Sequence, residues 1–385
     1  MFEVDDARMT VIQLLPGLEA GGVERGVVEV VGALVEGGHR AIVVSNGGRL
    51  VKRIESLGGE HVAMPIYKKS LMTLRCIRPL RKLIRDTRAD VLHARSRVPA
   101  WVGYRAWLGM PASNRPAWVT TVHGMYSVNR YSKIMTTGQR VEVVSNTIRK
   151  YVLSNYPGTD ADKLVLNHRG VDPADFIFGY QPSDDWLAKW LEEYPELAGK
   201  FVISLAGRIT RLKGHHDLID AIEQLQQQGV NAHALIVGDE DPRRLAYAKE
   251  LRDAVAEKGL ADHVTFTGHR SDIKEVLAVS DAVVSLSTKP ESFGRSVLEA
   301  VRLGRPVVGY DHGGVGEVLS EIYPHGLTPL SDGQALAQRL AAIASGQIPP
   351  PQPIDGKFLL GDMLKRTIAM YQDAVALNRQ PTASR

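Results

Sequence analysis

The sequence has little that would place it outside a reducing compartment or within a bilayer. Its 385 residues include one cysteine, Cys76, so a disulfide within the chain is excluded. No apolar run approaches the roughly 20 residues that a membrane-spanning helix needs. The acidic start MFEVDDARMT has no apolar stretch of the kind found in secretory signals. We therefore expect a cytoplasmic protein, with residues 1–8 as a tail or as the product of an upstream start codon.

An excess of either charge is also nearly missing, since the formal net charge is only +4. The cations are unevenly placed, however. Eleven of them lie between Lys68 and Arg105, opposed only by Asp86 and Asp90. Such a segment is either a solvated helix face or a surface for an anionic partner. Both interpretations stay open at this point.

Short β-branched runs recur along the chain, with helical patterns between them. Strand-like runs begin near residues 11, 41, 91, 117, 141 and 163, and a second series begins near residues 201, 233, 264, 282 and 306. These runs lack alternation between apolar and polar residues, which predicts parallel sheets covered by helices on both faces. The stretch 215–229 shows apolar residues at helical spacing and ends with Gly229, a helix-stop residue.

The domain boundary is expected within residues 170–200, which hold three prolines, clustered acids and no strand pattern. We expect an N-terminal domain over 1–178, a second domain over 179–350, and a tail with a helix over 351–385 that packs back towards the first domain. Each half is predicted to be a doubly wound α/β sheet. Open parallel sheets bind ligands beyond the carboxyl ends of their strands.

The first strand–helix turn contains Gly21 and Gly22 within EAGGVERG. These glycines give the backbone freedom to hold an anion at a helix N-terminus, or they simply form a tight turn. The turn is not G-x-G-x-x-G, and the second strand ends in Ser45 and Asn46 rather than in a ribose-binding acid. A nicotinamide dehydrogenase is therefore disfavoured.

Two cations and two acids in the second half carry stronger chemistry. Arg208 ends a strand and Lys213 lies just before a helix, which suits a diphosphate and would stabilise a leaving group. Glu291 lies in a loop before a helix expected to begin at Gly294, where a carboxylate suits sugar hydroxyls. Glu299 follows on an otherwise apolar stretch of that helix and needs a partner. Each residue, taken singly, is equally compatible with a solvated surface position.

Taken together, GRITRLKG, HALIVGDE, VTFTGHRSD, ESFGRSVLEAVRLGRPVV and DHGGVGEV, in that order and spacing, resemble the retaining glycosyltransferases of the GT-B fold, family four. The resemblance covers nearly the whole chain. Its most specific element is the pair of glutamates within ESFGRSVLE. It implies an α/β fold of the GT-B type, in which two Rossmann-like doubly wound parallel-sheet domains face a cleft between them.

The resemblance also implies roles for matching residues. In it, Arg208 and Lys213 bind the donor diphosphate, Glu291 holds the donor sugar, Glu299 binds the ribose hydroxyls, and His123 lies beside the transferred sugar. The implied catalytic residues are His123, Arg208, Lys213 and Glu291. The implied donor-binding residues are Gly21, Gly22, Gly238, Arg270, Ser292, Phe293, Gly294 and Glu299. Similar enzymes retain anomeric configuration by attack on the face that the diphosphate leaves, and the nucleotide sugar is their substrate.

The triplet Asp239–Asp241 superficially matches the Asp-x-Asp sequence by which other glycosyltransferases hold a divalent metal. Arg208 and Lys213 already supply the positive charge that a metal would bring, and the twelve histidines show no spaced cluster. No metal or other cofactor is therefore expected. A departure from the family is the insertion of His168 and Arg169 into its Asn-Gly-Val-Asp sequence.

Basic residues at the end of the strand-like run near residue 91 indicate where an acceptor binds. His93, Arg95 and Arg97 lie within HARSR, in the half that binds acceptors in similar enzymes, so an anionic acceptor fits. With the cation-rich segment, they suggest an enzyme that rests on an anionic membrane surface while it glycosylates a glycolipid or a phosphorylated glycan.

The most specific hypothesis is a hexosyltransferase of lipopolysaccharide core synthesis that uses a UDP-sugar at the inner face of the cytoplasmic membrane. No nucleic acid partner is expected. Two alternatives remain. One is a GT-B sugar-nucleotide epimerase, which would act on the donor alone. The other is a non-catalytic sugar-nucleotide-binding protein.

Overall fold

The computed structural model describes residues 8–19, 21–240 and 245–380, and its contacts divide the chain into two units. Unit 1 is Met1–His168 with Gly361–Arg385, and unit 2 is Arg169–Leu360. The observed division precedes the boundary expected at residue 178. Its position follows from pairing between the two ends of unit 2, where Val171 lies beside Leu359 and the Leu360 N–H donates to the Val171 carbonyl at 3.0 Å.

Unit 1 contains a seven-stranded parallel sheet in the order β3-β2-β1-β4-β5-β6-β7. Its strands are β1 (Thr10–Leu14), β2 (Arg40–Ser45), β3 (Glu60–Ala63), β4 (Val91–Ala94), β5 (Ala117–Val122), β6 (Arg140–Val143) and β7 (Leu164–Leu166). The sequence analysis missed β3. This strand lies at the edge of the sheet with half-exposed residues, so it carries no buried apolar run.

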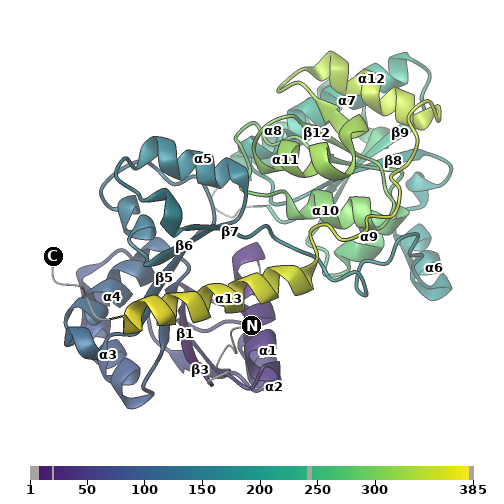
Figure 1. Ribbon diagram of the computed structural model, residues 1–385. Helices are drawn as coiled ribbons and strands as arrows, with labels where there is room; N and C mark the ends of the chain where they lie inside the picture. The colour runs from purple at the N-terminus through teal and green to yellow at the C-terminus, as the bar shows by residue number, and fades with distance from the viewer. Residues whose placement is uncertain (1–7, 20, 241–244, 381–385) are drawn as a thin grey trace. The chain divides into compact units, whose positions relative to one another are not determined.

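Helices cover both faces of this sheet (Figure 1). One face packs against α3 (Ile77–Asp86), α4 (Arg97–Leu108) and α5 (Asn146–Asn155), and the other against α1 (Gly22–Glu36), α2 (Val51–Ser56) and α13 (Leu360–Arg379). Short 3-10 helices are η1 (Leu71–Cys76), η2 (Ala112–Asn114), η3 (Ser132–Thr136) and η4 (Ala161–Lys163). In β1, Ile12 faces the first core and Val11 the second. Burial on both faces explains why these strands show no polar alternation.

Unit 2 contains a six-stranded parallel sheet in the order β10-β9-β8-β11-β12-β13. Its strands are β8 (Phe201–Ala206), β9 (Ala232–Val237), β10 (Val264–Gly268), β11 (Ala282–Ser285), β12 (Val307–Tyr310) and β13 (Leu327–Thr328). The edge strand β13 was not expected, because its two residues are too few to form a recognisable run. The doubly wound parallel-sheet architecture predicted for both halves is confirmed.

The helices of unit 2 are α6 (Asp184–Glu193), α7 (His215–Gln227), α8 (Leu245–Glu257), α9 (Ile273–Val279), α10 (Arg295–Arg302), α11 (Gly313–Ile322) and α12 (Gly333–Ala344). Its 3-10 helices are η5 (Pro195–Leu197), η6 (Arg211–Lys213), η7 (Ala261–His263) and η8 (Pro324–Gly326). In the part of the chain that the structure describes, no helix of either unit combines the length and apolar character needed to cross a membrane.

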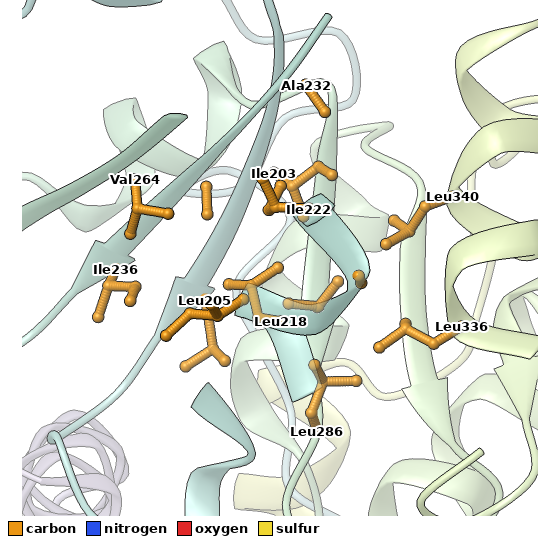
Figure 2. Packing of buried hydrophobic residues seen from close by; sticks show 14 of the residues in the cluster. Ile203, Leu205, Leu218, Ile222, Ala232, Ile236, Val264, Leu286, Leu336 and Leu340 are labelled. Carbon is orange, nitrogen blue, oxygen red and sulfur yellow. The ribbon is translucent and has the colours of Figure 1, made fainter. Parts of the chain in front are cut away.

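The larger core of unit 2 explains why α7 forms where the sequence predicts it. Leu218 and Ile222 lie one turn apart on the buried face of α7. Figure 2 shows them directed towards Ile203 and Leu205 of β8, with Leu336 of α12 beside them. Fully burying each of these aliphatic side chains contributes roughly 1.5–3 kcal/mol. This packing fixes the N-terminus of α7 at the carboxyl edge of the sheet.

Candidate active site

The first part of the candidate site joins the end of β8 to the start of α7. Arg208 is exposed just after β8, and Lys213 ends the 3-10 turn that precedes α7. A Cβ atom placed on Gly207 would lie 3.2 Å from the Lys213 Cε, so the lysine side chain lies across the backbone next to Arg208. Gly214 has φ +71° and forms the N-cap of α7. Lys213 therefore lies at the N-terminus of α7 and Arg208 lies earlier in the same strand–helix connection, while the binding of a diphosphate by these two cations stays a prediction.

Lys213 is joined to Glu291 from a separate loop. The Lys213 Nζ donates to the Glu291 Oε1 at 2.6 Å, and the Ser287 hydroxyl donates to the same oxygen. Burial alone would raise the pKa of Glu291, but the Lys213 ammonium and the Ser287 hydroxyl outweigh it and hold this pKa below its usual range. Glu291 is thus an ionised, partly buried acceptor.

The loop that carries Glu291 is supported by the DHGG turn. The Gly314 N–H donates to the Glu291 carbonyl at 2.7 Å, and a Cβ at Gly314 would fall 2.3 Å from the Phe293 Cα. His312 donates through its Nε2–H to the Ser287 carbonyl at 2.7 Å, since a carbonyl can only accept. Sequence reasoning missed Ser287 and His312 as site residues, although both follow strands at the carboxyl edge.

The helix that follows this loop begins where the sequence predicts. Gly294 has φ +91° and forms the N-cap of α10, while Phe293 is buried and Ser292 is half-buried beside it. Glu299 is only 5% exposed. Its Oε1 accepts from the Arg295 Nε at 3.1 Å. The partner that a carboxylate on an apolar helix requires is thus supplied, at least in part, by Arg295 one turn earlier.

Gly238 and Arg270 follow β9 and β10 along the same edge. Gly238 has φ +152°, and a Cβ there would fall 2.1 Å from the Gly207 carbonyl oxygen, so the ends of β8 and β9 approach as only glycine allows. Arg270 is bonded to Asp272 and Glu193 and lies 5.2 Å from the Trp190 ring centroid. The contact of Arg270 with a nucleobase stays a prediction, since its guanidinium already has carboxylate partners.

In unit 1, the predicted glycines and His123 also lie at a carboxyl edge. Gly21 is the extended N-cap of α1, and Gly22 is the first residue of that helix. A Cβ at Gly21 would fall 2.5 Å from the Glu24 Oε2, whereas a Cβ at Gly22 would meet no atom within 4 Å. His123 directly follows β5, and its backbone N–H donates to the Tyr126 hydroxyl at 3.3 Å. The roles assigned to these residues stay predictions.

The prediction that His93 and Arg95 reach an acceptor is wrong, because both are buried, with exposed fractions of 0% and 1%. The His93 ring lies 2.7 Å from the Tyr371 hydroxyl and 2.6 Å from the Thr121 hydroxyl. Thr121 donates to the Glu142 carboxylate at 2.6 Å, so the His93 Nε2–H donates to Thr121. These residues attach α13 to the sheet.

Glu142 holds the centre of this buried polar cluster, which lies between the sheet and α13. Its side chain is fully buried and lies 3.7 Å from the Arg95 Nη1. It also accepts from the Asn167 amide at 2.8 Å. The Arg95 Nε donates to the Gln13 side chain at 2.9 Å. Asn167, which begins the NHRG sequence, thus has an internal structural role in unit 1.

Arg97, the third predicted acceptor residue, is half-buried at the start of α4. Its guanidinium carbon lies 4.7 Å from the Tyr126 ring centroid and 5.8 Å from that of Tyr131. Its Nη1 donates to the Ser132 hydroxyl at 3.3 Å. Arg97 therefore joins the loops at the carboxyl edge of unit 1, and its acceptor role stays a prediction.

A bound divalent metal would need several ligating side chains close together. Among residues 8–19, 21–240 and 245–380, no group of three or more His, Cys, Asp or Glu side chains could hold a metal ion. The Glu240 side chain pairs with Arg252, and Asp239 lies 3.6 Å from the His269 ring. Asp241, the last residue of the Asp-x-Asp match, lies outside the described residues.

Two family models match the chain, one in each half. Residues 20–175 match Glycosyltransferase Family 4, and residues 188–353 match Glycosyl transferases group 1. A curated relative, the lipopolysaccharide core biosynthesis mannosyltransferase LpsB of Rhizobium meliloti, is 29% identical over 161 residues, which cover 42% of this chain and 44% of LpsB. The chain spans between 33% and 56% of the length of the first curated relatives that it matches.

Solved structures match over almost the whole chain. A glycosyltransferase from Rickettsia africae is 28% identical, with a TM-score of 0.83 over 96% of this chain and 99% of its own. Anabaena HepE, solved with UDP and glucose, is 23% identical, with a TM-score of 0.76 over 95% of this chain and 100% of its own.

Proposed function

We propose that this chain, which has the GT-B fold and whose two halves match the Glycosyltransferase Family 4 and Glycosyl transferases group 1 models, is a retaining hexosyltransferase. It moves a hexose from a UDP-sugar to an anionic or lipid-linked glycan. The observation that carries the proposal is the Lys213–Glu291 ion pair. Lys213 lies just before α7 and Glu291 lies in the loop before α10, so the pair joins these two segments. A cation for phosphate and a carboxylate for hydroxyls thus meet at one edge of unit 2.

Lys213 and Arg208 suit the diphosphate of the donor. The Lys213 ammonium has three N–H groups and gives one to Glu291, so the others can bind phosphate oxygens. Arg208 presents a planar fork that can grip two oxygens. The N-terminus of α7 adds partial positive charge at the same place. Together they stabilise the charge that grows on the departing nucleoside diphosphate.

Glu291 suits the donor sugar because an ionised carboxylate only accepts hydrogen bonds, and hydroxyls donate them. In the reaction the acceptor oxygen bonds to the anomeric carbon while the bond from that carbon to the diphosphate oxygen breaks. The proton of the acceptor hydroxyl passes to the leaving phosphate. Attack on the face that the diphosphate leaves retains configuration, and the family resemblance supports this course and the place of His123 beside the sugar.

The identity of the donor and the lack of a metal belong to the same proposal. HepE, which has the same fold, was solved with UDP and glucose, and this supports UDP as the nucleotide. No divalent metal is included, because Arg208 and Lys213 supply the positive charge at the diphosphate. Transfer should therefore persist in the presence of EDTA, and abolition of transfer by EDTA would contradict this part.

The acceptor is proposed to be a phosphorylated glycan or glycolipid of lipopolysaccharide core synthesis, met at the inner face of the cytoplasmic membrane. The likeness to LpsB, a core mannosyltransferase, supports the pathway. The segment from Lys68 to Arg88 supports the anionic surface, because most of its cations are exposed on η1, α3 and the adjoining turns. Each cation near an anionic bilayer contributes roughly 1 kcal/mol.

The test is transfer from radiolabelled UDP-hexoses to lipopolysaccharide acceptors by the full chain. Lys213→Ala and Glu291→Ala should each lower the turnover number by roughly 10²–10³-fold, the usual effect of removing a group that stabilises the transition state. Arg211→Ala is the matched control, since Arg211 lies in the same 3-10 turn but pairs with Glu250 on the surface. Its turnover should stay within about twofold. Undiminished transfer by Lys213→Ala would overturn the proposal.

Incubation with donor alone separates the alternatives. A sugar-nucleotide epimerase would convert the donor without an acceptor, and a non-catalytic binding protein would bind the donor with no product in either condition. The proposed transferase should release sugar to an acceptor and leave the stereochemistry of unreacted donor unchanged.

A further inference from the structure

Unit 1 contains a hollow of about 450 Å³. None of the residues proposed above to bind the donor lines it. It lies between the segment Lys68–Ile77 and α4, with Tyr131 closing one side. Its volume falls in the range of about 300–1,000 Å³ that small-molecule sites have. The segment follows β3, α4 follows β4, and Tyr131 lies in the loop after β5. The hollow is therefore at the carboxyl edge, where open parallel sheets bind ligands.

The inner wall of the hollow is apolar. Leu74, Ile77, Val98 and Val102 line it, and Val102 is only 2% exposed. The Trp101 Nε1–H donates to the Tyr131 carbonyl at 3.0 Å, so the polar atom of the indole is satisfied within the protein. Its ring stacks on that of Tyr131 with the centroids 6.3 Å apart, and the two rings together add apolar surface to the hollow. This wall suits a hydrocarbon chain better than a bare sugar or a bare phosphate.

The outer rim is cationic. Lys68, Lys69 and Arg105 are exposed and line the same hollow. Among the described residues that line it, none is acidic. The Lys69 Nζ lies 4.6 Å from the centroid of the Tyr131 ring, which holds this cation near the mouth while its N–H groups can still bind phosphate oxygens. An apolar wall under a cationic rim matches an amphiphile with an anionic head.

Exposed aliphatic side chains continue from this mouth to the surface. Leu71 and Met72 are 84% and 59% exposed, although aliphatic side chains gain free energy by leaving water. The turn that presents them is fixed, because the Ser70 hydroxyl caps it by accepting from the Met72 N–H at 3.2 Å. Such side chains flanked by lysines are typical of segments that enter the headgroup region of a bilayer.

We propose that this hollow binds the phosphate-bearing end and the first part of the hydrocarbon chain of a lipid, which is the anchor of the acceptor. The inference rests on the proposed function in one respect, namely that the acceptor is lipid-linked. Leu71 and Met72 contact the bilayer, the chain of the lipid lies against Val98 and Val102, and its phosphate is bound by Lys68 and Lys69.

The test is isothermal titration of the full chain with dodecyl phosphate below its micelle-forming concentration. Inorganic phosphate and dodecyl maltoside are the comparison ligands, because each lacks one half of the proposed chemistry. Val98→Trp fills the hollow, and the double variant Lys68→Glu, Lys69→Glu reverses the charge of the rim. Leu74→Glu is a second change to the wall at a half-exposed position, where folding is easily kept. Lys133→Glu, at an exposed position of η3, is the matched control.

Dodecyl phosphate should bind at least roughly tenfold more tightly than either comparison ligand, because it uses both halves of the site. Each change to the wall or the rim should weaken its binding by about tenfold or more, and Lys133→Glu should not. Equal affinity for the three ligands, or undiminished binding by both wall variants, would overturn the proposal.

A vesicle assay separates the lipid site from the membrane contact of Leu71 and Met72, and donor binding separates it from the proposed transferase function. Leu71→Asp with Met72→Asp should lose co-flotation with vesicles of phosphatidylcholine and phosphatidylglycerol while keeping affinity for dodecyl phosphate. Loss of both would overturn the separate roles of segment and hollow. UDP-sugar binding and transfer report on Lys213 in unit 2. Failure of those with intact dodecyl phosphate binding would reject the transferase function and leave the lipid site standing.

Discussion

Replacing Glu142 with alanine should weaken unit 1 more than any exposed charge removal. The carboxylate is fully buried. It accepts hydrogen bonds from the Thr121 hydroxyl at 2.6 Å and from the Asn167 amide at 2.8 Å, and it lies 3.7 Å from the Arg95 guanidinium. Its loss leaves two hydrogen-bond donors without this acceptor and a buried cation without its counter-charge. Breaking a buried ion pair in this way costs about 3–5 kcal/mol.

The expected change is large enough for two independent measurements. Unit 1 has about 190 residues, and for a unit of that size 1 kcal/mol shifts the melting temperature by roughly 2–4 °C. Glu142→Ala should thus lower it by roughly 6–20 °C. The opening free energy of the amides in β5 and β6 should fall by the same amount, so these amides should exchange faster. The amides of α7 in unit 2 serve as the internal reference.

Two further variants make the Glu142 prediction decisive. Glu142→Gln keeps an acceptor oxygen and should show a smaller loss. Glu60→Ala removes a carboxylate that pairs with Arg40 at 2.6 Å with 47% of its side chain exposed, so it should cost no more than about 1 kcal/mol. A loss below about 1 kcal/mol for Glu142→Ala would refute the view that this cluster holds unit 1 together.

Three other outcomes follow from unit 2. Lys213→Ala should raise the pKa of Glu291, because the ammonium that most strongly opposes burial is lost and only Ser287 and His312 still lower this pKa; the melting temperature should fall further below that of Arg211→Ala at pH 7 than at pH 4. Burial lowers the pKa of His233 to about 4, so the unfolded chain alone binds this proton between pH 6.5 and 4. Because of this histidine, the free energy of unfolding should fall by at most about 1.4 kcal/mol for each pH unit of acidification. Calorimetry should show a weaker dependence of this free energy on pH for His233→Asn. Gly238→Ala should destabilise the protein by roughly 1–3 kcal/mol in urea unfolding, because φ is +152° and a Cβ would meet a carbonyl oxygen; no change would contradict the close approach of β8 and β9.

The fold was largely predictable because its signals are local. Buried strands such as β9 have every residue buried, and α7 repeats Leu218 and Ile222 on one face. The positions of the proposed donor residues were predictable for a related reason, since Arg208, Lys213 and Glu291 lie in connections that lead from a strand to the next helix. A residue that follows a strand of a parallel sheet is placed at the ligand edge by topology alone.

The errors arise where the deciding contact is distant in sequence. His93 was interpreted as an acceptor residue from its strand-end position, but its side chain meets Tyr371 of α13, 278 residues later. Arg95 is similarly buried beside Glu142. The domain boundary depends on the pairing of Val171 with Leu359. In each of these pairs the two residues lie far apart in the sequence, so local periodicity and composition carry no information on the contact between them.

The insertion of unit 2 into unit 1 affects the order in which the chain can fold during synthesis. Domains generally fold as they emerge, N-terminal first. Here unit 2 is complete once residue 360 has been made, whereas unit 1 still lacks α13. Until Tyr371 emerges, His93 has no partner from that helix, and the face of the first sheet that α13 covers is packed only against α1 and α2. The second half of this protein can therefore finish folding before the first.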